Sequence, residues 1–311
     1  MFRKLTLLGM VFITSVSVVS ADSSAAGTSG AQFLKISVDA RQSALGGAGA
    51  TVSGSQSMFY NPAGLSSVAN FDLSLTQVNW FQDIRYSNLS AAKKFNFGVI
   101  GFSINYLTSS SIDKYDNTGT MLNETYDVSD TALGLGYATE IYKGVSVGGN
   151  VKYLTDRIET HTANALSFNC GLVYREIVSK LDLGIAIQNI GSEVKYISVG
   201  DPQPLTYKLG AAYNIPVGES DEPGGVIVCS DVNSANDTGI YANFGLEIYK
   251  EFTEDSTYFI RGGYRTDLSD KANGVSLGVG LKYNIYVIDY AYSALGDLGQ
   301  ATRITVSLRF N

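Results

Sequence analysis

The sequence predicts an all-β fold, an antiparallel transmembrane β-barrel of about fourteen strands with an N-terminal hatch segment in its lumen. Three observations predict this fold. Most of the chain after residue 70 alternates between apolar residues and small or polar residues. Charged residues make up only 16% of the 311 residues, below the roughly 25% of ordinary soluble domains. No stretch beyond the first 21 residues contains the roughly 18 consecutive apolar residues that a membrane-spanning helix requires.

The composition also narrows the classes of function. The chain contains 33 Gly, 20 Tyr and 14 Phe but only 5 Pro, which is typical of strand-rich barrels. Its net charge of −7 argues against nucleic acid as a partner, because no basic stripe is present to neutralise phosphates. From composition alone, a soluble secreted β-sandwich or solenoid is the alternative fold. That fold would carry more charge on its solvent-facing side than this chain does.

Residues 1–21 predict a cleaved Sec-type signal peptide. Arg3 and Lys4 form the positive segment, and Leu5 to Val19 form an apolar segment that ends near a small-residue cleavage site after Ala21. A second possible cut follows Ala26. The alternative, a membrane-anchoring helix, is disfavoured because the apolar segment is too short and too rich in Ser and Thr. No Cys follows it, so we expect no lipoprotein anchor.

Residues 22–70 lack the two-residue period of a membrane strand, and they do not form a charged soluble domain. They are rich in small residues and carry turn signals at Asn61-Pro62 and Gly64-Leu65. We therefore expect them to pack inside the barrel as a hatch or plug. The Gly-rich run 45–50 lacks the Gly-Lys-Ser/Thr ending of a nucleotide-binding loop.

The strand pattern occupies residues 71–311. It is clearest at Val275–Tyr283, where every odd position is apolar and every even position is small or polar, placing the two sets on opposite faces. Similar alternation predicts about fourteen strands. Their approximate spans are 71–81, 83–92, 95–107, 126–141, 143–157, 161–175, 180–190, 205–215, 225–234, 239–250, 256–266, 274–283, 284–293 and 301–310.

The connections between these spans fit a barrel with one end of long loops and one end of short turns. The long stretches 108–125 and 191–204 both follow odd-numbered strands, whereas the turns near 141–143 and 283–284 are short. The turn from Ile215 to Gly224 is long for its side and leaves open a missed strand. The phase change near Gly98 and Gly101 predicts a β-bulge. The final strand ends in Phe310-Asn311 and resembles the signal read by barrel-assembly machinery, although the aromatic residue is usually last.

Four short motifs of the N-terminal segment, taken together, resemble the opening of the PorV/PorQ family, within the wider FadL-like group of outer-membrane proteins. The motifs are Phe33-Leu34-Lys35-Ile36, Ala40-Arg41, Leu45-Gly46-Gly47-Ala48 and Asn61-Pro62-Ala63-Gly64-Leu65. The resemblance implies a fourteen-stranded barrel with an N-terminal hatch. It implies either passage of hydrophobic compounds across the outer membrane or, as in PorV-type members, an accessory role in type IX protein secretion.

Catalytic and metal-binding chemistry finds little support in the sequence. The single histidine, His161, cannot form a metal cluster, and no Ser-His pair with a supporting motif is present. We therefore expect no enzyme and no cofactor. Cys170 and Cys229 match no metal spacing; they either pair in an oxidising compartment or act as small apolar residues.

The candidate functional residues fall into two groups. Hatch residues expected to line a ligand pocket are Phe33, Leu34, Arg41, Phe59, Tyr60, Asn61 and Pro62. Three charged residues, Glu247, Arg261 and Asp289, are expected to face the lumen, where they either line a path or bond the plug. Phe310 is the expected assembly signal.

Three functions remain open at this point. The first is FadL-like passive transport of hydrophobic small molecules across the outer membrane of a Gram-negative-type cell. The second is a secretion accessory whose loops 108–125 and 191–204 hold protein partners. The third is a structural barrel with a sealed plug. In each case outer-membrane lipid and the assembly machinery are expected partners, together with either hydrophobic small molecules or secretion-system proteins.

Overall fold

The computed structural model describes residues 27–217, 223–267 and 274–310. The predicted signal peptide, both of its candidate cleavage sites and Asn311 lie outside the described residues.

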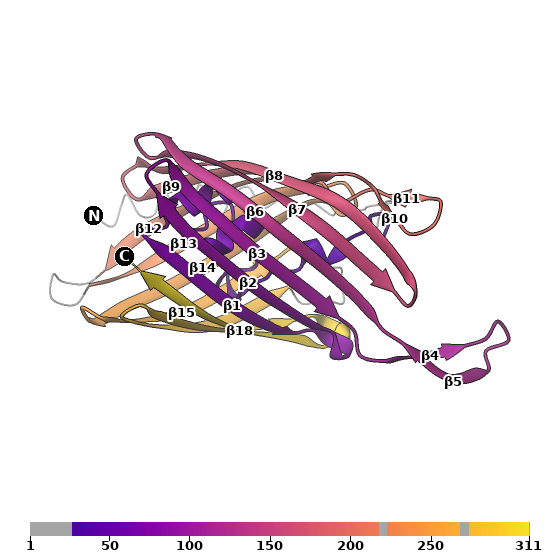
Figure 1. Ribbon diagram of the computed structural model, residues 1–311. Helices are drawn as coiled ribbons and strands as arrows, with labels where there is room; N and C mark the ends of the chain where they lie inside the picture. Colours follow the sequence, from indigo (N-terminus) through magenta and orange to yellow (C-terminus); the bar gives the residue numbers. More distant parts are fainter. Residues whose placement is uncertain (1–26, 218–222, 268–273, 311) are drawn as a thin grey trace.

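Fourteen strands close into one antiparallel barrel, in which the last strand pairs with the first (Figure 1). The predicted antiparallel barrel of about fourteen strands is confirmed, and each predicted span covers most of one strand of the barrel. The strands are β1 (Phe71–Asn79), β2 (Arg85–Phe95), β3 (Gly98–Thr108), β6 (Val128–Tyr142), β7 (Val145–Ile158), β8 (His161–Val178), β9 (Leu181–Gly191), β12 (Thr206–Val217), β13 (Gly224–Ala235), β14 (Gly239–Thr253), β15 (Ser256–Arg265), β16 (Val275–Tyr283), β17 (Tyr286–Ala294) and β18 (Gln300–Phe310).

The β-bulge predicted near Gly98 is wrong. β2 ends at Phe95 and β3 begins at Gly98, and the two pair without a register shift. β3 also pairs with β6 without a shift. The change in the phase of the alternation therefore comes from the two-residue hairpin turn Asn96-Phe97. The turn is hard to recognise in the sequence because Phe97 is apolar. Register shifts occur instead in other pairs, for example between Glu140 and Tyr142 of β6.

The long turn near Ile215 does not hide a missing strand. β12 and β13 pair directly with one another, from Val217 opposite Gly224 to Thr206 opposite Ala235. The barrel therefore closes without a further strand between them.

The two ends of the barrel differ in their connections. The end that we call the loop end carries the hairpin β4 (Ile112–Tyr115) and β5 (Met121–Tyr126), which projects beyond the barrel, and the small hairpin β10–β11 (Val194–Lys195 and Gly200–Asp201). It also carries the 3₁₀ turns η4 (Phe81–Asp83) and η5 (Gly296–Leu298). The opposite end, the turn end, has tight turns such as Lys143-Gly144.

The wall is apolar outside and polar inside, as the alternation predicts. On the outer face Leu75, Leu135, Ile260 and Leu277 are each more than half exposed. Small polar residues such as Ser74, Ser90, Asn105 and Asn150 are buried inside. An apolar outer face that nothing in the described chain covers is the surface that a lipid bilayer accommodates.

Aromatic residues gather where strands meet the turn end. Phe71 and Phe310 pack at 5.9 Å between ring centroids, and Phe95 stacks on Phe97 at 5.5 Å. Phe97 also stacks on Tyr137 at 6.4 Å. Such a belt is typical of the membrane interface of a barrel.

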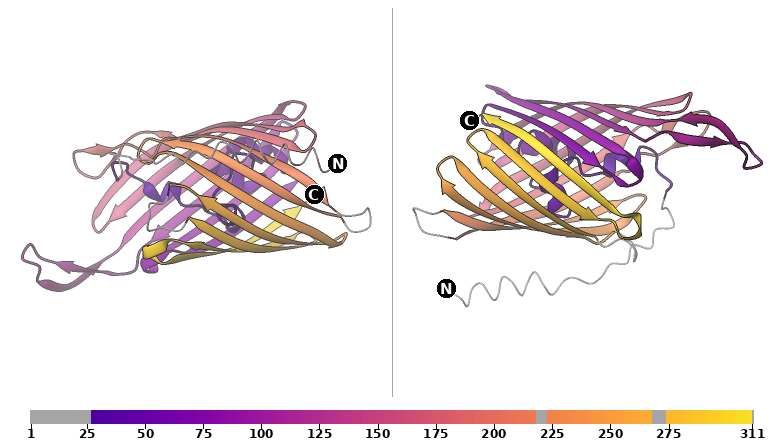
Figure 2. Two further views of the ribbon diagram at one scale, coloured as in Figure 1. Left: turned by 180° about the vertical axis from the view of Figure 1, so that it is seen from behind. Right: turned by 90° about the horizontal axis from the view of Figure 1, so that it is seen from below.

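The N-terminal segment, residues 27–70, lies inside the barrel (Figure 2). It contains the turns η1 (Gln32–Lys35), η2 (Ser55–Phe59) and η3 (Pro62–Ser67) and the short helix α2 (Ala40–Ala44). η3 lies against β6, β7 and β8, and α2 lies against β15 to β18. Among the described residues no helix has the length and hydropathy needed to cross a membrane.

Local chemistry explains where α2 begins and ends. The side chain of Asp39 accepts a hydrogen bond from the backbone N–H of Gln42 at 2.7 Å, the usual cap at a helix N-terminus. Gly46 and Gly47 follow the helix with φ of 68° and 84°. Glycine adopts this left-handed conformation without strain, so the chain turns sharply there.

Candidate functional site

A chain of four alternating charges ties α2 to the wall. Arg41 donates two hydrogen bonds of 2.8 Å to the carboxylate of Glu247 on β14. Arg261 on β15 donates to the same carboxylate at 2.5 Å and to Asp289 on β17 at 2.6 Å. Glu247, Arg261 and Asp289 are at most 3% exposed. Two cations and two anions balance one another, which is what permits charges to stay buried.

Turn η3 is held by uncharged contacts. The Asn61 amide donates to the carbonyl oxygens of Ala50 at 2.7 Å, Leu172 at 3.1 Å and Ile185 at 3.3 Å. Its carbonyl accepts from Ala63 N–H at 3.2 Å, which caps the turn. A Cβ atom at Gly148 of β7 would lie 2.6 Å from the Pro62 carbonyl oxygen. Only glycine therefore lets the segment approach the wall this closely.

Arg175, at the turn end of β8, binds residues 51–53, which lie between α2 and η3 in the N-terminal segment. Its guanidinium donates to the carbonyl oxygens of Thr51 at 2.7 Å and Val52 at 3.2 Å, and to the Ser53 hydroxyl at 2.8 Å. Asp182 accepts from the same group at 2.7 Å. The sequence reasoning missed this residue, because a register shift between Tyr174 and Val178 breaks the alternation there.

An apolar cluster fills the lumen toward the loop end. Phe33 is 3% exposed and meets Tyr86 of β2 edge to face, with ring centroids 6.5 Å apart. Tyr60 is also buried within the cluster, and Leu34 and Phe59 pack against it while partly buried. The structure thus brings four of the predicted pocket residues together, as packed side chains rather than as the rim of an open cavity.

Two cavities lie on opposite sides of the α2 region. The first, of about 220 Å³, lies at the loop end and is lined by Ile36, Trp80, Leu295, Leu298 and Arg303 together with Ser43, Gly46 and Gly47. The second, of about 520 Å³, is lined by Arg41, Gln42, Leu45 and Ala48 and, at the turn end, by Arg175 and Asp182. Successive residues of one short stretch thus line different cavities, which makes α2 and the residues after it the partition between them.

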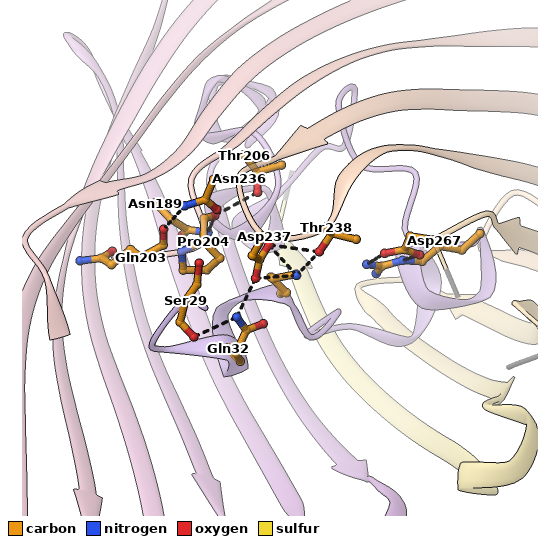
Figure 3. A network of polar contacts seen from close by, with 12 residues as sticks. Ser29, Gln32, Asn189, Gln203, Pro204, Thr206, Asn236, Asp237, Thr238 and Asp267 are labelled. Carbon is orange, nitrogen blue, oxygen red and sulfur yellow. Dashed lines mark hydrogen bonds and ion pairs between the residues drawn. The ribbon is translucent and has the colours of Figure 1, made fainter. Parts of the chain in front are cut away.

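The start of the N-terminal segment is tied to the loop between β13 and β14 (Figure 3). Gln32 donates to Asp237 at 2.6 Å, and Lys35 forms an ion pair with the same carboxylate at 3.0 Å and a hydrogen bond to Thr238. Burial raises the pKa of Asp237, but these hydrogen bonds from Gln32 and Lys35 outweigh it and hold the pKa below its ordinary value.

The remaining singled-out residues lie apart from these contacts. Phe310 ends β18 at the barrel surface and is 39% exposed. His161 is exposed at the start of β8. Cys170 and Cys229 are both free thiols, on β8 and β13 respectively. No group of three or more potential metal ligands exists in the part of the chain that the structure describes.

Comparison with known proteins supports the fold. No family model matches the chain, and no curated protein matches it either. The Ralstonia pickettii toluene transporter TbuX superposes with a TM-score of 0.59 at 13% identity, covering 88% of this chain and 98% of that one. For the Pseudomonas putida toluene transporter TodX the values are 0.57, 12%, 86% and 95%. For a Pseudomonas aeruginosa FadL homologue they are 0.54, 10%, 88% and 98%. At these identities the likeness shows a shared fold.

Proposed function

We propose that this protein is an outer-membrane barrel through which hydrophobic small molecules pass without an energy source, in the manner of FadL-like proteins. The N-terminal segment acts as a hatch between the loop end and the turn end. The PorV/PorQ-like motifs of the segment and the names of the similar toluene transporters support this proposal.

The outer membrane is the location that best fits the surface of the barrel. Its outer face is apolar, and aromatic residues ring the turn end. A chain with these features needs export before insertion, which the signal-like residues 1–21 would provide. Phe310 would then serve the assembly machinery as the C-terminal signal.

The observation that carries the transport proposal is the pair of cavities divided by α2. The loop-end cavity has apolar walls at Ile36, Trp80 and Leu295, and cavities of its size accept a single aromatic ring. Burial of the apolar ligand surface would drive binding there. The way onward leads past α2 into the turn-end cavity, so passage requires α2 to move.

Locking α2 to the wall tests this proposal. Leu45, just after α2, packs against the free thiol of Cys229 on β13. Leu45→Cys places a second thiol there, so that oxidation forms a reversible disulfide between the partition and the wall. Uptake of labelled toluene by intact cells carrying the variant should fall on oxidation and recover with reductant.

The control is Leu45→Cys combined with Cys229→Ser, which cannot form the bond. Equal uptake by the oxidised and reduced Leu45→Cys protein would rule out α2 as the moving part. No uptake above cells without the protein, for toluene and for a long-chain fatty acid alike, would support a sealed structural barrel.

A second candidate function is a PorV-like accessory role in type IX secretion. The β4–β5 hairpin projects beyond the barrel (Figure 1) and exposes Tyr115, Met121 and Leu122 by 46–60%. Exposed apolar residues on a projecting element suit a protein partner. Purification from the native outer membrane, with and without residues 111–126, would show whether secretion-system proteins depend on this hairpin.

A further inference from the structure

A row of inward-facing residues crosses six strands near the loop end. Each member is the direct partner of the next across the sheet, so that neighbouring members lie side by side on the inner face of the wall. The row consists of Val78, Tyr86, Leu107, Asp130, Asp156 and Ala163. Two carboxylates therefore stand side by side in an otherwise apolar row.

No cation of the described residues compensates the two carboxylates. Neither Asp130 nor Asp156 forms an ion pair or a side-chain hydrogen bond, and Asp156 is 3% exposed with one oxygen unpartnered. Lys152, the inward cation of the same strand, is four residues away, about 13 Å along the strand, and donates to Asn189 at 2.8 Å. Like charges directly opposite one another destabilise a sheet, and a buried unpaired charge costs more still.

Two tyrosines lie in the same part of the lumen as the acidic pair. Tyr86 is 1% exposed and lies two strands away from Asp130 in the row. Tyr196, in the connection between β10 and β11, packs against the same apolar cluster as Phe33. Burial, together with the negative charges of Asp156 and Asp130, raises the pKa of Tyr196 to about 12. Negative potential and aromatic surface thus meet at one place.

We propose that Asp130 and Asp156 bind the ammonium group of a hydrophobic amine, whose apolar body lies against the partly buried Tyr196. The inference rests on the proposed transport function and names a substrate class for it. The ammonium group supplies the counter-charge that the carboxylate pair lacks, and aromatic faces attract organic cations. A calcium ion fits less well, because it takes six to eight oxygen ligands and no third acidic or histidine ligand joins the pair among the described residues.

The only tryptophan of the chain provides the readout. Trp80 packs against the apolar cluster, so a ligand bound there should change its fluorescence. The full-length protein in detergent would be titrated with phenylethylammonium and with 2-phenylethanol, its neutral counterpart of similar size. The same titrations would follow for Asp130→Asn, Asp156→Asn and the matched control Asp127→Asn, which removes an exposed charge at the same end. Circular dichroism would confirm that each variant is folded.

We expect phenylethylammonium to bind the wild-type protein more tightly than 2-phenylethanol does, and each of Asp130→Asn and Asp156→Asn to weaken it about tenfold or more. The control variant should bind both compounds as the wild type does. Equal affinities for the two compounds in every variant would overturn the amine site and leave transport of neutral compounds standing. If neither compound binds the wild-type protein, that result would count against the proposed function itself. Binding of calcium ions with no gain from the phenyl group would make the pair a metal site and refute the proposal.

Discussion

Turn η3 and helix α2 both lie against the inner wall, but their polar anchors differ. Asn61 anchors η3 through neutral hydrogen bonds to backbone carbonyls, beside glycine positions such as Gly148 that let the two backbones meet. Arg41 anchors α2 through one carboxylate, Glu247, that it shares with Arg261. The α2 region is closely packed as well, since a Cβ atom at Gly263 of β15 would lie 2.1 Å from the backbone nitrogen of Gly46. Its charged contact differs from the Asn61 contacts in that it depends on one carboxylate, which a single substitution neutralises.

The comparison suggests that η3 and α2 have different roles within the N-terminal segment. η3 fixes the segment to β6, β7 and β8, whereas α2 on the opposite side divides the two cavities. Buried ion pairs add little net stability compared with apolar packing, but they specify one position. We therefore infer that α2 is the more readily displaced of the two elements.

Removing the charge of Glu247 should have the largest effect. Glu247→Gln keeps the side-chain volume but leaves the guanidinium groups of Arg41 and Arg261 without their carboxylate, at a cost of about 3 to 5 kcal/mol. Hydrogen exchange of residues 40–48 should accelerate strongly, while that of residues 62–67 stays slow. Glu254→Gln, in the exposed turn after β14, is the control. Equal acceleration in both regions would mean that the segment moves as one body.

Removing the Asn61 amide should have a smaller effect, and it should loosen η3 in place of α2. Asn61→Ala leaves the carbonyl oxygens of Ala50, Leu172 and Ile185 without this donor, at a cost of about 1 to 3 kcal/mol. Exchange should now accelerate at residues 62–67 and not at residues 40–48. If α2 loosens as much as η3, the two anchors are coupled and the proposed difference between their roles fails.

Acid should have the smallest effect, at the loop-end anchor. The pKa of Asp237 is lower in the folded protein than in the unfolded chain, where it is about 3.9. Its contribution is therefore complete above that value and is lost as pH falls through the folded pKa. Protection of residues 32–35, corrected for intrinsic exchange, should fall as the pH falls through the folded pKa. Asp237→Asn should abolish the dependence; if it persists, another group is responsible.

Most strands of the wall could be predicted from the sequence, because apolar residues alternate with small or polar residues along each strand. The failure at Gly98 is instructive, since Phe97 places an apolar residue in a two-residue turn where polar residues are usual. The positions of Glu247 and Asp289 in the alternation of their strands also indicate that both side chains face inward. They do not indicate that Arg41, more than 200 residues away, bonds Glu247, because nothing local specifies where an irregular segment lies in the lumen. Asp130 and Asp156 were overlooked for the same reason: only the register places them side by side.

The pairing of β1 with β18 has a consequence for biogenesis. β1 is synthesised before the other barrel strands but cannot complete its pairing until β18 is present, because Phe71 lies opposite Phe310 where the barrel closes. Until then both edges remain unpaired and open to other chains. The N-terminal segment must be enclosed as the seam forms, since its contacts reach strands on both sides of the lumen. Loss of even the final strand should therefore leave an unsealed sheet with nothing to hold the segment, rather than a slightly smaller barrel.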